Sequence, residues 1–269
     1  MEPNDRVSMW LKIVPTLLQH LNIRHVSLAA HSGGTIYALS TLLYLRHLLH
    51  PTTPYIALCA PWVHPSHSGT PLMSLVHTLP AGLVNTFDTV ERFVNTTISP
   101  MVGFSTGLSS GLRTTARRKY PAKSADELGW IEHEEQLMPK ILERIHRESV
   151  QGLSADALVL LKKTGRDDVW GAWRDVDAFV PMLANVEKDI ASENEASKLK
   201  IEVFYAEEDN MIGIAAGPRW LDDCWRPEQR GDEIQYNSRF VDGTDHNNIL
   251  NIEFGIMEHI FENIPGHGP

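Results

Sequence analysis

One short segment combines a serine with the small neighbours that a strained catalytic turn requires. Residues 26–34 have the sequence VSLAAHSGG, an apolar strand pattern that leads into Ser32 and then into a helical pattern. A serine hydroxyl on a sharp strand-to-helix turn is exposed to substrate and can attack an acyl carbon. Strand and helix approach each other closely there, so the residues two positions away must be small. Ala30 and Gly34 meet this need.

This arrangement resembles the nucleophile elbow of the α/β-hydrolase family, of the serine hydrolase or esterase type. The sequence has Ala30 where the common pattern has glycine, a mild change because a methyl group is the smallest side chain that could be added. The resemblance implies an α/β fold with a partial α/β-hydrolase core, a mostly parallel sheet flanked by helices. It also implies that the backbone N–H of Gly33, at the positive end of the next helix, donates to an oxyanion.

The same resemblance implies an acid after a later strand and a histidine after the last strand. Asp209 stands third after the small residue that ends an apolar strand, and Glu207 and Glu208 are nearby substitutes. His246 follows the last strand pattern in a Gly-x-x-His loop. In this interpretation His246 takes the proton of Ser32, and Asp209 holds the imidazole in the required tautomer.

A strict Gly-x-Ser-x-Gly match occurs elsewhere, at residues 103–107 around Ser105. Ser99 and Pro100 interrupt the residues before it, and a Gly- and Ser-rich stretch follows where a helix should begin. The strand–turn–helix setting is therefore missing. We predict Ser32, and not Ser105, as the nucleophile.

Other polar residues give weaker indications. His31 could face the pocket, but a packed or solvated side chain is the commoner outcome, so it is left outside the catalytic set. His64 and His67 have no carboxylate partner in their pattern, which makes them a poor metal site. The sequence implies no metal and no organic cofactor.

The hydrophobic periods divide the chain into two parts. Strand patterns alternate with helical patterns at both ends of the chain, which indicates a parallel sheet with helices on both faces. From residue 62 to residue 198 helical periods dominate, with little strand pattern. We therefore expect an α/β-hydrolase-like core formed by residues 1–61 and 199–269, and a helical cap or lid inserted at residues 62–198.

The composition fits a globular enzyme and excludes several other classes. The 269 residues include 24 basic and 34 acidic ones, a formal net charge of −10, and 42% are apolar. This acidic balance does not suit binding to nucleic acid, and no apolar run has the roughly 20 residues of a transmembrane segment. Cys59 and Cys224 are expected to be buried free thiols. The start of the sequence lacks a secretory signal, so the expected location is cytoplasmic.

The sequence departs most from the family before the elbow. Only 25 residues precede Val26, and they hold one helical pattern and no credible strand, so the early strands and the loop with a second oxyanion N–H have no counterpart. We expect the strand at 26–30 to have an open edge, which favours self-association. Losing one oxyanion donor costs on the order of 10²- to 10³-fold in turnover. Either the sequence is an incomplete chain, or a partner or a rebuilt N-terminus fills the gap, or the protein is a non-catalytic remnant.

The predicted function is a serine hydrolase that cleaves a carboxylic ester or related acyl substrate through an acyl-serine intermediate. A serine at the elbow argues against the family's epoxide hydrolases and dehalogenases, which the resemblance would require to have a carboxylate there. Ester, thioester and small peptide substrates stay open, as does acyl transfer. The alternative is a truncated or non-catalytic relative that acts as a binding protein.

Overall fold

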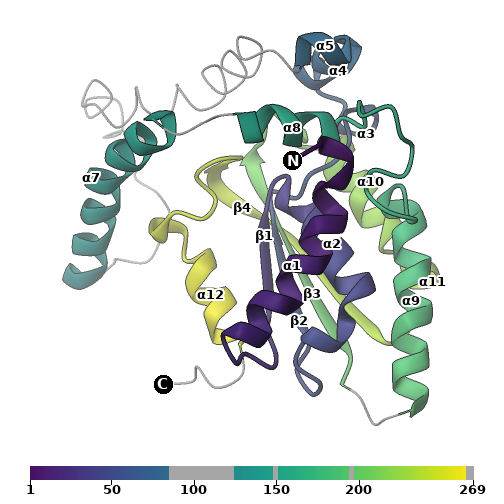
Figure 1. Ribbon diagram of the computed structural model, residues 1–269. Coiled ribbons are helices and arrows are strands. Elements are labelled where there is room, and N and C mark those ends of the chain that lie inside the picture. The colour runs from purple at the N-terminus through teal and green to yellow at the C-terminus, as the bar shows by residue number, and fades with distance from the viewer. Residues whose placement is uncertain (85–123, 148–150, 194–196, 265–269) are drawn as a thin grey trace.

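A parallel sheet forms the centre of the molecule. The computed structural model describes residues 1–84, 124–147, 151–193 and 197–264, and Figure 1 shows their arrangement. Within these ranges four parallel strands pair in the order β1-β2-β3-β4. The strands are Leu28–His31, Tyr55–Cys59, Leu199–Glu208 and Ile234–Asp245. The parallel α/β architecture predicted from the sequence is confirmed.

Alternate residues of the strands face two separate hydrophobic clusters. Ile56 and Leu58 belong to the larger cluster, whereas Ala57 and Cys59 belong to the smaller one. All five residues of β2 are buried, as expected for a parallel strand that is covered on both faces. The larger cluster packs against α2 (Gly34–Tyr44) and α9 (Val176–Glu193), and the smaller one against α12 (Ile256–Glu262), on opposite sides of the sheet in Figure 1.

Strand β1 lies at an open edge of this sheet. Among the described strands it pairs only with β2, and an isolated parallel bridge between Val26 and Leu49 extends that pairing. Ala29, in the middle of β1, is exposed. The open edge predicted from the sequence is thus present in the described structure, whereas self-association through it stays a prediction.

Helix α1 (Arg6–His20) follows a short 3-10 turn at Pro3–Asp5 and packs against α2. A proline inside a helix favours a kink or a division into two pieces, but the helix continues through Pro15 as one element and is not divided. Val7 is its buried residue, while Ile13 and Leu17 are each 50% exposed. Helix α1 therefore leaves part of its apolar face open to solvent.

Helices connect β2 to β3, and the described residues of this segment contain no strand. They are α3 (Pro65–Ser68), α4 (Pro71–Thr78), α5 (Ala81–Val84), α7 (Ala125–Arg147), α8 (Gln151–Leu160) and α9. The apolar pattern of the sequence favours a helix over residues 71–94, but α4 ends at Thr78, because the residue before Pro80 adopts an extended conformation. The apolar pattern favours a helix over residues 170–190, but α9 begins at Val176, since Gly171 has a φ of +103°.

The division of the chain into core and cap stays a prediction, and one contact bears on it. Phe179 and Leu183 of α9 lie in the larger hydrophobic cluster together with sheet residues. Glu187 of the same helix forms a buried bidentate ion pair with Arg46, which follows α2, at 2.5 and 3.0 Å. Helix α9 thus packs against the sheet through its apolar residues and is joined to the segment after α2 by the ion pair.

The last part of the chain completes the fold with α10 (Ala216–Cys224), α11 (Pro227–Arg230), the 3-10 helix η3 (Ile252–Phe254) and α12. The sequence predicts one closing helix at 252–264, but Gly255, with a φ of +68°, separates η3 from α12. Cys59 and Cys224 are buried free thiols, as predicted, and burial raises the pKa of each to about 12. None of the described helices combines the length and the apolar character needed to cross a membrane.

Candidate active site

Ser32 occupies a strained turn between β1 and α2. Its φ is +52°, in the left-handed region that non-glycine residues rarely adopt. The turn is held by the end of β2: the Ser32 N–H donates to the carbonyl of Cys59 at 3.1 Å, and the Ser32 carbonyl accepts from the Trp62 N–H at 3.1 Å. The Thr35 hydroxyl donates to the same carbonyl at 2.7 Å. These bonds fix the serine at the carboxyl end of the strand.

The small residues around Ser32 have the role that the sequence predicts. A Cβ atom added to Gly34 would lie 3.7 Å from the methyl of Ala30, so strand and helix meet in ordinary contact and the alanine fits. A Cβ atom on Gly33 would lie only 2.8 Å from Cδ1 of Leu160, at the end of α8. The Trp62 indole N–H donates to the Leu160 carbonyl at 3.2 Å. Leu160 therefore lies over the turn, and Gly33 leaves room for it.

His246 lies in the loop that follows β4 and is only 4% exposed. Its Nε2 is 2.8 Å from Oγ of Ser32, and its Nδ1 is 2.7 Å from Oδ2 of Asp209. Because the carboxylate only accepts, Nδ1 carries the proton when the ring is neutral, and Nε2 is left to accept from the serine hydroxyl. Hydrogen bonds within the loop fix its shape. The Asp245 side chain accepts from the backbone N–H groups of Asn247 and Asn248, and the Asn248 side chain accepts from the Asp245 N–H.

Asp209 lies directly after β3 and is 2% exposed. Its Oδ1 accepts from the N–H groups of Met211 and Ile212 at 2.8 and 2.9 Å, which directs Oδ2 toward His246. The loop is tightly packed, since a Cβ atom on Gly217 would lie 2.0 Å from the Ile212 carbonyl oxygen. The two backbone donors therefore fix the orientation of the carboxylate in this buried position.

The structure brings Asp209, rather than either neighbouring glutamate, to His246. Glu207 accepts from the Gly243 N–H at 2.6 Å, and Glu208 is exposed at the end of β3. Hydrogen bonds thus join three residues, with His246 between Ser32 and Asp209. Gly33 lies at the amino end of the 11-residue helix α2, where the helix dipole favours negative charge. Ser105 lies outside the described residues.

Two contacts at the site involve residues that sequence reasoning left out. His31 Nε2 is 2.6 Å from the backbone carbonyl oxygen of His246, and the two rings lie 5.3 Å apart. Buried Thr244 donates to the Val241 carbonyl at 2.6 Å and accepts from the Glu207 N–H at 3.4 Å, which joins the ends of β3 and β4. The position of His31 directly before Ser32 is a local signal, but no local pattern marks Thr244.

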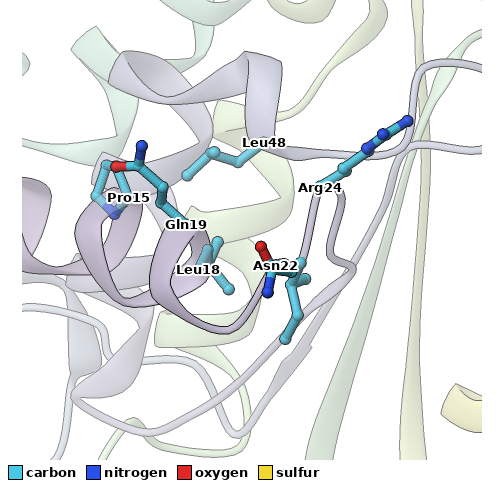
Figure 2. A pocket seen from close by; sticks show the side chains of 7 residues that line it. Pro15, Leu18, Gln19, Asn22, Arg24 and Leu48 are labelled. Atoms are coloured by element: carbon cyan, nitrogen blue, oxygen red, sulfur yellow. The ribbon is translucent and has the colours of Figure 1, made fainter.

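The described residues hold no group of three or more His, Cys, Asp or Glu side chains that could bind a metal. His64 and His67 turn to different partners: His64 Nδ1 is 2.8 Å from the Ser66 hydroxyl, and the His67 ring stacks on Trp220 at 3.8 Å. A cleft of about 420 Å³ lies at the carboxyl end of α1, bordered by Pro15 and other residues labelled in Figure 2. None of the residues that line this cleft belongs to the triad arrangement.

Solved structures share this fold. Epoxide hydrolase I of potato (Solanum tuberosum) aligns with 97% of this chain and 77% of its own, with a TM-score of 0.51 and 12% identity. A laboratory-evolved variant of the potato enzyme aligns over the same shares at a TM-score of 0.55 and 12% identity. The enol-lactonase from Burkholderia xenovorans LB400 aligns with 96% of this chain and 72% of its own, with a TM-score of 0.47 and 13% identity.

The comparisons by sequence add nothing to this, because no family model and no curated protein matches the chain. The structural matches define the class: the chain has the α/β-hydrolase fold. At 12% identity they carry the fold and not the activity, so the chemistry must be argued from the residues at the site.

Proposed function

We propose that this protein is a serine hydrolase that cleaves a carboxylic ester or a related acyl compound. The observation that carries the proposal is the hydrogen-bonded series Ser32–His246–Asp209, with distances of 2.8 and 2.7 Å, at a serine with a φ of +52°. A serine whose hydroxyl contacts a buried, oriented imidazole is the arrangement that activates an oxygen nucleophile.

The first half of the reaction forms the acyl-serine. Ser32 Oγ attacks the acyl carbon while its proton passes to Nε2 of His246, and the carbonyl oxygen becomes an oxyanion. The N–H of Gly33, at the amino end of α2, is the donor available to that oxyanion. Collapse of the tetrahedral intermediate breaks the bond to the leaving group, which takes the proton from His246.

The second half regenerates the enzyme. A water molecule gives a proton to His246 Nε2 and attacks the acyl carbon, and the proton then returns to Ser32 Oγ as the carboxylic acid leaves. Asp209 stabilises the imidazolium that forms in each half. Its Oδ1 is already bound by the N–H groups of Met211 and Ile212, so little reorganisation is needed when the charge appears.

The side chain at position 32 separates this proposal from the activity of the potato epoxide hydrolases. An ester link to an opened epoxide requires a carboxylate nucleophile, and Ser32 supplies a hydroxyl. The position of Leu160 over Gly33 supports residues 62–198 as a cap whose helix α8 borders the acyl site. Ester, thioester and peptide substrates share the acyl chemistry.

A second candidate function is binding without catalysis, and the open edge of β1 favours it. Unpaired backbone groups at a sheet edge can accept a strand from another chain or from a second copy. Sedimentation velocity at increasing concentration measures self-association, and Ala29→Lys, a charge on the edge strand, should weaken it.

Fluorophosphonate labelling of the purified chain, with the labelled residue located by peptide mass spectrometry, tests the proposed activity. Label on Ser32, and its loss in His246→Ala, is the expected result. A folded protein that takes no label would contradict the hydrolase and favour the binding function. Label on a serine other than Ser32 would contradict the assignment of the nucleophile.

A further inference from the structure

We infer that His31 is a positioning residue, which holds the backbone of His246 so that the imidazole stays within reach of Ser32. The inference concerns the same site as the proposed function, and its kinetic consequences rest on that function. Its structural consequence, a fixed position of the His246 ring, does not depend on that function.

The need for such a contact follows from the sheet order. Ser32 follows β1 and His246 follows β4, which are the two outer strands of the described sheet, with β2 and β3 between them. Strand pairing therefore fixes the distance between these two residues only through two intermediate strands. A direct bond across the carboxyl end of the sheet would fix it more firmly.

His31 makes that bond. It is the last residue of β1 and lies beside Cys59 in register, and Cys59 in turn lies beside Phe204. Residues that pair in this way point to the same face, which here is the face of the smaller hydrophobic cluster. From this face His31 Nε2 lies 2.6 Å from the His246 carbonyl oxygen. A carbonyl can only accept, so Nε2 is the protonated nitrogen and donates.

The other contacts of the loop do not replace this one. Asp245 and Asn248 bond to backbone groups within the loop itself, and Thr244 joins β4 to its neighbour β3. These bonds determine the shape of the loop and its place beside β3. The hydrogen bond from His31 differs from these, because it joins the His246 loop to β1, the strand that Ser32 follows.

The chemistry of the ring suits this role. Burial lowers the pKa of His31 below its ordinary value, although the hydrogen bond to the His246 carbonyl oxygen acts in the opposite direction. The ring is therefore neutral near pH 7 and can donate through Nε2 without placing a positive charge beside His246. This matters because His246 itself must become a cation during acyl transfer, with its ring centre 5.3 Å from that of His31.

Two variants separate the hydrogen bond from the bulk of the ring. His31→Phe keeps a planar ring and removes the donor, whereas His31→Gln keeps an N–H donor at similar reach. The exposed His25, at the start of the same strand region, provides the control His25→Phe. We expect His31→Phe to lower kcat for a short-chain aryl ester by about 10- to 100-fold, the size of effect that a misplaced catalytic group produces. KM should stay within about twofold, and His31→Gln should recover most of the rate.

A spectroscopic measurement tests the inference without any substrate. The Nδ1 proton that His246 donates to Asp209 gives a downfield imidazole resonance in the proton NMR spectrum, assigned by its loss in His246→Gln. We expect His31→Phe to broaden or shift this resonance while His31→Gln and His25→Phe leave it in place. An unchanged resonance in folded His31→Phe would overturn the inference, even if the chain hydrolyses esters. A wild-type chain that has no activity but shows the expected change would overturn the proposed function and support the role of His31.

Discussion

His246 Nε2 lies 2.8 Å from Ser32 Oγ although the two residues follow the two outer strands of the described sheet. The loops at the carboxyl ends of parallel strands converge over one edge of the sheet, and this convergence makes the contact possible. Asp209 follows β3, the strand beside β4, and completes the arrangement through its contact with Nδ1 of the imidazole.

Removal of either reacting group should abolish ester hydrolysis. We expect Ser32→Ala and His246→Ala to lower kcat for a short-chain aryl ester by about 10⁴-fold or more, because the residues act as one unit. The matched control is Ser105→Ala, which alters the serine of the other Gly-x-Ser-x-Gly match and should keep full activity. Equal loss in a folded Ser105→Ala protein would refute the assignment of the elbow.

The acid can be tested by a neutral isostere. Asp209→Asn should lower kcat by about 10³- to 10⁴-fold, since an amide cannot hold the imidazole in the tautomer that accepts the serine proton. Glu208→Gln changes an exposed acid one residue earlier and should have little effect. Steady-state kinetics measures both effects. A larger loss of kcat in Glu208→Gln than in Asp209→Asn would identify Glu208 as the acid.

Stability should fall as the pH is lowered toward 4. His64 is 7% exposed, and burial, assisted by Lys162, lowers its pKa from 6.5 to about 4. Between these two pKa values His64 binds a proton in the unfolded chain but not in the folded chain. The free energy of unfolding therefore decreases as pH falls, by up to about 3 kcal/mol. Above pH 6.5 this contribution is fully present.

Urea unfolding at pH 7 and at pH 4.5 measures that difference. His64→Phe should reduce it, while the part due to His31, whose pKa is also lowered by burial, should persist. His25→Phe, which alters an exposed histidine, should leave the difference unchanged. The role of His64 is refuted if its variant shows the same loss of stability as the wild type.

Removing one partner of the buried ion pair between Arg46 and Glu187 should destabilise the protein more than removing both. Glu187→Gln leaves the buried guanidinium without its counter-charge and is expected to lower the free energy of unfolding by about 3–5 kcal/mol. The double variant Arg46→Met with Glu187→Leu removes both charges and should cost far less. Chemical denaturation compares the two, and a double variant as unstable as the single one would contradict this account.

Much of the fold and site could be predicted because local patterns carry it. The strand, the small neighbours and the glycines around Ser32 are all within nine residues of sequence, and the structure retains each of them. Helix ends were harder to predict: Gly255 divides the closing helix, and Gly171 delays the start of α9. Apolar periodicity continues through such positions, whereas the backbone conformation does not.

The sequence by itself determined the parallel α/β pattern and the turn at Ser32, because each depends on neighbours a few residues away, whereas the chain order of serine, acid and histidine was implied by the resemblance to the α/β-hydrolases. Only the tertiary structure decided which acid contacts His246: Glu207 turns to Gly243, whereas Asp209, held by two backbone N–H groups, turns to the imidazole. The tertiary structure also decided the partner of His31. Such contacts join residues more than 30 positions apart, and their geometry is set by the pairing of strands and the course of loops, which no local spacing records.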